Sequence, residues 1–79
     1  MQAKYYLAAQ TAMSELKAAV LGVVLSGPEE GMRNVEIGRA LGIYGGHKGH
    51  QGHISRVCLQ RLQEEVLLKQ LDNKLWTRS

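Results

Sequence analysis

Residues 54–62, ISRVCLQRL, have the apolar spacing of a helix that packs one side against a protein core. At about 100 degrees per residue, most apolar side chains of this segment fall on one face. That face holds Ile54, Ser55, Cys58, Leu59, Leu62 and Val66. The opposite face holds His53, Arg56, Val57, Gln60, Gln63 and Glu64, with Arg61 at its margin. The spacing predicts a helix over about 53–66 that ends at Gln70 at the latest.

A second, shorter helix is predicted just upstream in NVEIGRALGI, residues 34–43. Asn34 is a favourable N-cap, and Glu36 suits the positive end of a helix. Gly42 is expected to end this helix after about two turns, because glycine readily adopts the left-handed conformation found just beyond helix ends.

The N-terminal segment predicts a long helix over residues 2–25, which contain no proline and one glycine and are followed by Gly27 and Pro28 as a stop. Its apolar residues recur at spacings of three and four: Tyr6, Ala9, Met13, Leu16, Val20 and Val23. A helix of about 35 Å exceeds what one small core needs. It therefore either breaks near Thr11 or Ser14 or packs its N-terminal half on another chain. We expect residues 1–13 to be an extra helix or a dimerisation extension. The heptad-like register fits either a homodimer through the N-terminal helix or burial of this stripe within the same chain.

The C-terminal residues 67–78, LLKQLDNKLWTR, alternate apolar and polar side chains around Asp72 and Asn73. These two residues tolerate the left-handed conformation that a two-residue hairpin turn requires, so we predict a small β-hairpin. Because two strands alone are marginally stable, Leu75 and Trp76 are expected to anchor the hairpin on the helices.

Length and composition predict one mainly α-helical domain spanning residues 1–79. The single cysteine, Cys58, lies among apolar residues, which excludes a disulfide framework and favours a reducing compartment. Polar residues interrupt the N-terminal apolar stretch, unlike a secretory signal, so a cytoplasmic or nucleoid-associated location is expected. No catalysis is expected, because Ser55 has no evident base and no nucleotide-binding phosphate motif is present.

Positive charge is concentrated in the middle of the sequence. The formal net charge is +3. Residues 31–63 hold five cations against one carboxylate, Glu36, while the segments before and after sum to −1 and zero. These cations are Arg33, Arg39, Lys48, Arg56 and Arg61. A local basic patch of this kind is typical of nucleic-acid binding.

The order of long helix, short helix, turn, longer helix and hairpin resembles the winged helix-turn-helix superfamily. The likeness covers about residues 14–78 and rests on NVEIGRALGI (34–43), ISRVCLQRL (54–62), EEVLL (64–68) and LWTR (75–78). It implies a three-helix core with an extended N-terminal helix, a recognition helix beginning at His53, and a wing with Asp72 and Asn73 at its tip. Two features depart from the family. The turn exceeds the usual three or four residues, and Val66 stands where glycine is common.

The resemblance also implies binding to double-stranded DNA, with the N-terminal half of the recognition helix in the major groove. By position, the base contacts are assigned to His53, Arg56, Val57 and Gln60. Arg56 can bond guanine at two atoms, Gln60 can pair with adenine, and Val57 can touch a thymine methyl group. Matching this segment to the recognition helix of the family from its start, or from Leu62, gives two registers that differ by one residue. The phosphate contacts are assigned to Arg39, His47, Lys48, His50, Lys74 and Arg78.

The stretch IYGGHKGHQGH, residues 43–53, holds four of the nine glycines and all three histidines. Glycines let backbone N–H groups approach an anion, and Lys48 and the histidines add donors, which predicts phosphate contacts. The histidines recur every three residues, a spacing also compatible with zinc, copper or nickel. No nearby cysteine or carboxylate completes a four-ligand shell, so we predict neither a metal nor a cofactor.

The combined features predict a sequence-specific double-stranded DNA-binding domain, acting as a transcriptional regulator or a DNA-targeting module and not as an enzyme. The alternative is a protein-interaction winged helix or a dimerisation adaptor without nucleic-acid binding, because one fold serves several functions.

Overall fold

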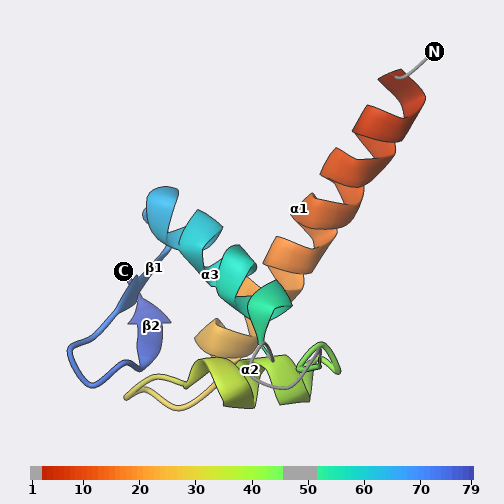
Figure 1. The fold of residues 1–79 in the computed structure, drawn as a ribbon. Helices are drawn as coiled ribbons and strands as arrows, with labels where there is room; N and C mark the ends of the chain where they lie inside the picture. Colours follow the sequence, from red (N-terminus) through yellow and green to blue (C-terminus); the bar gives the residue numbers. More distant parts are fainter. Residues whose placement is uncertain (1–2, 46–51) are drawn as a thin grey trace.

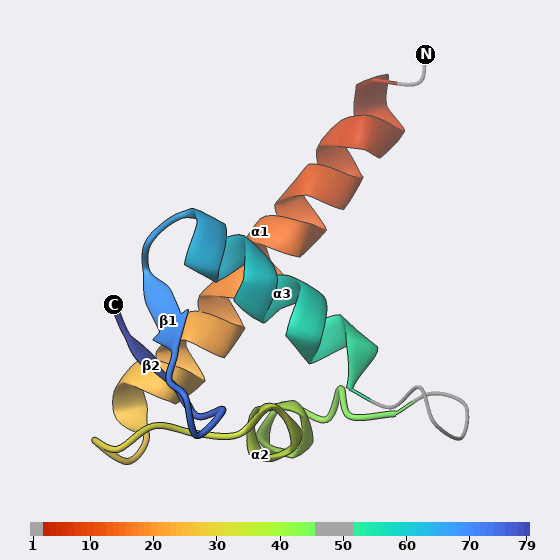
Figure 2. The ribbon, with the colours of Figure 1, turned by 60° about the vertical axis from the view of Figure 1, so that its left-hand side comes forward.

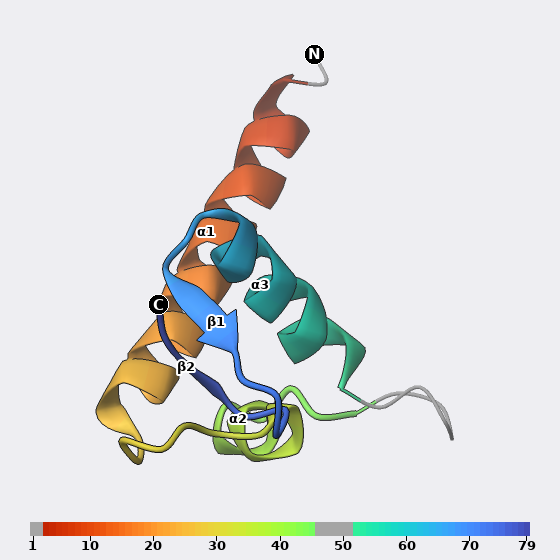
Figure 3. The ribbon, with the colours of Figure 1, turned by 90° about the vertical axis from the view of Figure 1, so that its left-hand side faces the viewer.

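The computed structural model describes residues 3–45 and 52–79, and these residues form three helices and a two-stranded antiparallel sheet. In chain order the elements are α1 (Ala3–Ser26), α2 (Asn34–Ala40), α3 (His53–Glu64), β1 (Leu68–Gln70) and β2 (Trp76–Arg78) (Figure 1). The C-terminal half of α1 packs beside α3, and α2 lies below both (Figure 2). The hairpin lies against α1 and α3 (Figure 3). The predicted mainly α-helical fold with a small hairpin is confirmed.

The core lies where the three helices and the hairpin meet. Its buried apolar side chains are Val20, Val24, Ile37, Cys58, Leu59, Leu62, Leu68 and Trp76. On α3 the buried residues are Ser55, Cys58, Leu59 and Leu62, which fixes the register of this helix. Ile54 and Val66, both predicted on the core face, are 50% and 72% exposed. Ile54 lies about 90 degrees from the centre of the buried face, and Val66 lies beyond the last helical turn.

Cys58 is fully buried at the contact between α3 and α1, as predicted for a small core residue. Burial raises the pKa of its thiol, an effect that the positive charge of Lys17 partly offsets. Lys17 also forms an ion pair with Glu65, which follows the end of α3. Because this pair is partly exposed, it contributes at most about 1 kcal/mol, so apolar burial holds α1 and α3 together.

α1 is one unbroken helix, so the first of the two alternatives, a break near Thr11 or Ser14, is wrong. Val20 and Val24 fix its C-terminal half in the core, and extending an existing helix through an alanine-rich segment costs little. Residues 3–12 are all exposed, and this part of α1 stands clear of the rest of the domain (Figure 1). By length and composition alone α1 is long and apolar enough to cross a membrane, but its buried valines belong to the core of this fold.

α2 begins one residue earlier than predicted, because Arg33 and not Asn34 is the N-cap. The Glu36 side chain accepts a hydrogen bond from the backbone N–H of Arg33 at 2.8 Å. Glu36 therefore closes the first turn from the N3 position. Asn34 is the first residue within the helix, which leaves its side chain available to contact α3.

α2 and α3 end in the same backbone arrangement. Gly42 after α2 has φ of 71°, and Ile43 donates a backbone hydrogen bond of 2.8 Å to the carbonyl five residues earlier. Val66 after α3 has φ of 59°, and Leu67 makes the equivalent bond at 2.9 Å. Both ends are Schellman motifs, in which glycine is usual at the left-handed position. The prediction that α3 continues to residue 66 is therefore wrong, because Val66 ends the helix in the conformation that glycine would take.

The hairpin is held to the helices by Trp76, whose side chain is only 5% exposed. Its backbone N–H donates to the Met32 carbonyl at 2.7 Å, and the Met32 N–H donates to the Trp76 carbonyl at 2.9 Å. The segment between α1 and α2 thus pairs with β2 at one position. Gly31 makes this approach possible, because a β-carbon there would lie 2.8 Å from the Trp76 carbonyl oxygen. Trp76 is confirmed as an anchor, and Leu75 is half-buried.

The hairpin loop has three residues, 72–74, instead of the predicted two. Leu71 donates its backbone N–H to the Leu75 carbonyl at 2.8 Å, and Lys74 donates to the Leu71 carbonyl at 2.8 Å. The left-handed residue is Lys74, with φ of 72°, and neither Asp72 nor Asn73 takes that conformation. This is the three-residue loop in which the last position is left-handed.

Replacing Val66 by glycine is expected to stabilise the protein by about 1 kcal/mol. A non-glycine residue in the left-handed conformation costs about 1–2 kcal/mol, and the greater freedom of glycine in the unfolded chain removes part of the gain. Urea unfolding of the two proteins measures the difference. Gly42→Ala, at the equivalent position after α2, is the control and should destabilise. An unchanged or lower stability of Val66→Gly would contradict strain at the end of α3.

Candidate nucleic-acid interface

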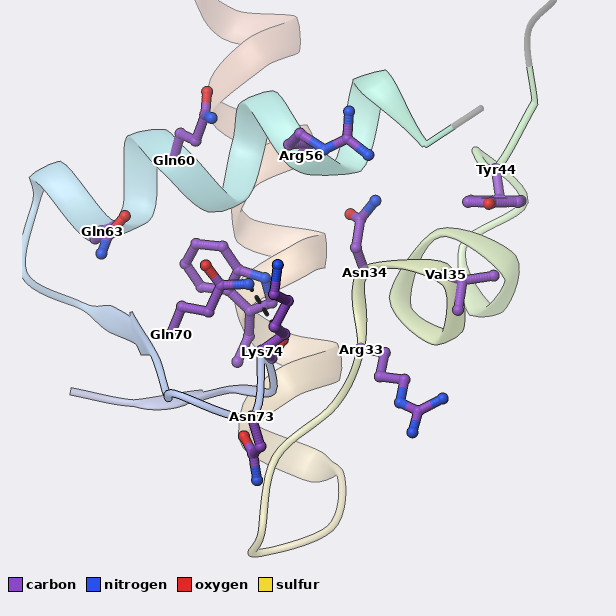
Figure 4. A pocket seen from close by; sticks show the side chains of 11 residues that line it. Arg33, Asn34, Val35, Tyr44, Arg56, Gln60, Gln63, Gln70, Asn73 and Lys74 are labelled. Carbon is purple, nitrogen blue, oxygen red and sulfur yellow. Dashed lines mark hydrogen bonds between the residues drawn. The ribbon is translucent and has the colours of Figure 1, made fainter. Parts of the chain in front are cut away.

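A groove of about 640 Å³ opens between α3, the start of α2 and the hairpin loop (Figure 4). α3 forms one side of the groove and the hairpin forms the other, with α2 between them at one end. Its lining residues are Arg33, Asn34, Val35, Tyr44, Arg56, Gln60, Gln63, Gln70, Asn73, Lys74 and Trp76. Three segments that are distant in sequence therefore converge on one concave surface.

The lining is positively charged and rich in amides. Arg33, Arg56 and Lys74 are cations, five other lining residues are asparagine or glutamine, and none of the lining residues is a carboxylate. Arginine and lysine bind phosphate oxygens strongly, and each amide offers both a donor and an acceptor. The surface is therefore suited to a polyanion that also presents hydrogen-bonding groups.

Two of the amides shape the hairpin loop. The Gln70 side-chain nitrogen donates to the Lys74 carbonyl at 3.2 Å. The Asn73 side-chain oxygen accepts the Leu75 N–H at 3.1 Å. These bonds hold the loop so that the Lys74 side chain rises toward α3 (Figure 4). Gln70 and Asn73 thus position a cation in the groove.

A third amide, Asn34, joins α2 to the start of α3. Its side-chain nitrogen donates to the Gly52 carbonyl at 3.2 Å, and its oxygen accepts the Ser55 hydroxyl at 2.7 Å. The Ser55 oxygen also lies 3.2 Å from the Gly52 carbonyl. Ser55 is fully buried, so this cluster satisfies a polar group inside the core. The cluster fixes the first turn of α3, which carries Arg56, against α2.

Tyr44 closes the same end of the groove. A β-carbon at Gly38 would lie 2.9 Å from Tyr44 Cβ, and one at Gly52 would lie 2.8 Å from the Tyr44 ring, so both glycines allow the ring to pack closely. The Arg39 guanidinium lies 5.3 Å from the centre of this ring, a cation–π distance. Tyr44 therefore holds Arg39 beside the groove, although Arg39 does not line it.

The structure separates the four predicted base-contacting residues into two pairs. Arg56 and Gln60 are exposed and line the groove. His53 and Val57 are also exposed on α3, but they lie outside the lining. Since Ser55, Cys58, Leu59 and Leu62 are buried, the structure selects the register in which all four predicted residues face outward.

The predicted phosphate contacts are dispersed. Lys74 lines the groove, and Arg39 lies next to it on Tyr44. Arg78 lies elsewhere, in a hollow of about 430 Å³ between the end of α1 and β2. His47, Lys48 and His50 lie outside the described residues. Within residues 3–45 and 52–79, no three histidine, cysteine or acidic side chains come together as metal ligands.

Eight lining residues were not predicted as site residues: Arg33, Asn34, Val35, Tyr44, Gln63, Gln70, Asn73 and Trp76. Gln63 follows Gln60 by three residues, so the helical period alone places it near the same face. Arg33, Gln70 and Asn73 belong to other segments, and their place in the groove depends on how the hairpin packs. Helical periodicity carries no information on that packing.

No family model, curated protein or solved structure matches this chain. The chemistry of the groove is therefore the basis for a functional proposal.

Asn34→Ala is expected to destabilise the protein by about 1–2 kcal/mol, because it removes two hydrogen bonds at a partly buried site. The Gly52 carbonyl loses the Asn34 donor, and the Ser55 hydroxyl loses the Asn34 acceptor. Urea unfolding monitored by circular dichroism measures this loss. Asn73→Ala is the matched control. It removes one exposed hydrogen bond in the hairpin loop, and about 0.5 kcal/mol is expected. Equal losses for the two variants would show that the Asn34 cluster does not fix α3.

Proposed function

We propose that this chain is a winged helix-turn-helix domain that binds double-stranded DNA sequence-specifically through the groove face, as a transcriptional regulator or DNA-targeting module. In this proposal α2 and α3 are the helix-turn-helix pair, α3 is the recognition helix, and the hairpin is the wing. A cytoplasmic or nucleoid-associated location accompanies this function.

The arrangement of elements supports the proposal. α2 and α3 are joined at Asn34, and the outer face of α3 is exposed along its length. The hairpin follows α3 and pairs at Trp76 with the segment before α2. An exposed helix of 12 residues beside a short hairpin has the dimensions of an element that enters a major groove while a neighbouring loop contacts the backbone.

The single observation that carries the proposal is the convergence of Arg56 and Lys74 on a lining without carboxylates. The two residues come from α3 and the hairpin loop, 18 positions apart. On a surface that is basic overall, cations would lie both inside and outside the groove. Acidic residues would also lie between them. Here the charge and the concave shape coincide, as in surfaces that follow a phosphate backbone.

The roles of individual residues follow from their placement. Arg56 and Gln60 contact base edges, with His53 and Val57 next to them on the outward side of α3. Arg33, Arg39 and Lys74 contact phosphates. His47, Lys48 and His50, which lie outside the described residues, keep the phosphate contacts assigned to them from the sequence. Arg78 is left out of this set, because it lies in the other hollow.

DNA affinity is expected to fall steeply with salt. If Arg33, Arg39, Lys48 and Lys74 each neutralise one phosphate, the slope of log affinity against log salt is about −3.6. Lys74→Ala should reduce this slope by about 0.9 on any duplex, since a phosphate contact reads no sequence. Arg56→Ala should cost about 1–3 kcal/mol at a specific site and weaken discrimination there. Fluorescence anisotropy at several salt concentrations measures both effects.

Lys69→Ala is the control for Lys74→Ala. Lys69 is an exposed lysine of β1, and strand alternation turns it away from the face that carries Gln70. It should leave both affinity and slope unchanged. If the wild-type protein shows no binding at low salt, or if Lys69→Ala and Lys74→Ala behave alike, DNA does not occupy the groove.

The second candidate function is a protein-interaction or dimerisation adaptor, favoured by the projecting half of α1. Tyr5, Tyr6 and Leu7 are each more than 60% exposed there. Met13 and Leu16 are partly buried against the core instead, so substituting them would unfold the domain as well as affect an interface.

If α1 mediates homodimerisation, wild-type protein is a dimer by sedimentation equilibrium and Tyr6→Glu and Leu7→Glu are monomers with unchanged helix content. Each substitution places a charge in an apolar contact, where desolvation would oppose association. Ala19→Glu is the control, because Ala19 is exposed on the half of α1 that packs on the domain. A monomeric wild-type protein excludes self-association at the concentrations used.

A further inference from the structure

The five amides of the groove fall into two groups. Asn34, Gln70 and Asn73 have hydrogen bonds within the chain and hold the structure in place. Gln60 and Gln63 make no such bond within the described residues, and both are exposed. The two glutamines of α3 are therefore the amides whose donors and acceptors remain available to a ligand.

Gln60 and Gln63 lie on one line with Arg56 along α3. At about 100 degrees per residue, the three residues fall within about 60 degrees around the helix. Gln60 faces outward, and Gln63 is turned toward the hairpin (Figure 4). With a rise of about 1.5 Å per residue, Gln60 lies about 6 Å and Gln63 about 10.5 Å along the axis from Arg56. One exposed stripe thus carries a guanidinium followed by two amides.

This spacing matches successive base pairs. Base pairs in B-DNA are stacked about 3.4 Å apart, so a helix lying along the major groove would place Gln60 about two base pairs and Gln63 about three base pairs beyond Arg56. Adenine presents an acceptor, N7, beside a donor, N6, and a glutamine amide pairs with both at once. Guanine presents two acceptors, which suit arginine.

Resting on the proposed function, we propose that α3 reads an ordered site in which a guanine is followed by adenines two and three base pairs further along the groove. Arg56 contacts the guanine, Gln60 the first adenine and Gln63 the second. Gln63 is thereby a specificity-determining residue in addition to the four assigned from the sequence. Base contacts explain why the stripe carries neutral amides, because phosphate binding alone would be served by lysine or arginine at the same positions.

Selection from a library of random duplexes, followed by sequencing of the bound fraction, tests the proposed order of guanine and adenines. The wild-type protein should enrich a guanine with adenines at the second and third following positions. Gln63→Glu should replace the second adenine by cytosine, because a carboxylate accepts the cytosine N4 donor. Gln60→Glu should make the same change at the first adenine only. Glu64→Gln is the control, since Glu64 follows Gln63 but does not line the groove, and it should leave the enriched site unchanged.

The outcomes separate this inference from the proposed function. If the wild-type protein retains duplex DNA with a steep salt dependence but shows no preference for adenine at those positions, the base order is wrong and DNA binding stands. If adenines are enriched but the glutamate variants do not change the base at their own positions, the assignment of Gln60 and Gln63 is wrong. If the protein retains no duplex at low salt, both the inference and the proposed function fail.

Discussion

The position of Trp76 is the constraint on which the groove depends. A two-stranded hairpin has too little buried surface to be stable alone. Here the indole is buried among the helices, and the Trp76 backbone forms two hydrogen bonds to Met32. The same residue therefore connects the core, the segment that precedes α2 and the hairpin. Because Lys74 is two residues from Trp76, its distance from Arg56 is set by this anchor and not by α3 itself.

Local periodicity was enough to predict the main elements. The positions of Ser55, Cys58, Leu59 and Leu62 predict a helix with one buried face, and that face is buried. The hairpin was predicted from alternation around Asp72 and Asn73, and its existence is confirmed. Both signals arise from contacts within a few residues of one another. The ends of the elements did not follow from these signals. Val66 ends α3 in a conformation that its side chain disfavours, because the chain must turn there to bring Leu68 into the core.

The candidate site was predictable only where it lies on one helix. Arg56 and Gln60 follow from the period of α3, and the structure places both in the groove. Asn34 illustrates the opposite case. Its residue type suits an N-cap, yet Glu36 caps α2 and Asn34 is bonded to Gly52 and Ser55. That role requires a partner about 20 positions away, which short-range propensities cannot identify. Arg78 was expected among the phosphate contacts as a cation of the predicted hairpin, but strand pairing places it in a different hollow.

The chain leaves α2 and returns to α3 at neighbouring points. Tyr44 and Gly52 lie side by side, and Asn34 bonds to the second of them. The described contacts between the two helices are thus made by residues outside the segment 46–51. Loop closure between fixed ends costs only about 0.6 kcal/mol for each doubling of length. Lengthening this connection is therefore expected to leave the direction of α3 unchanged.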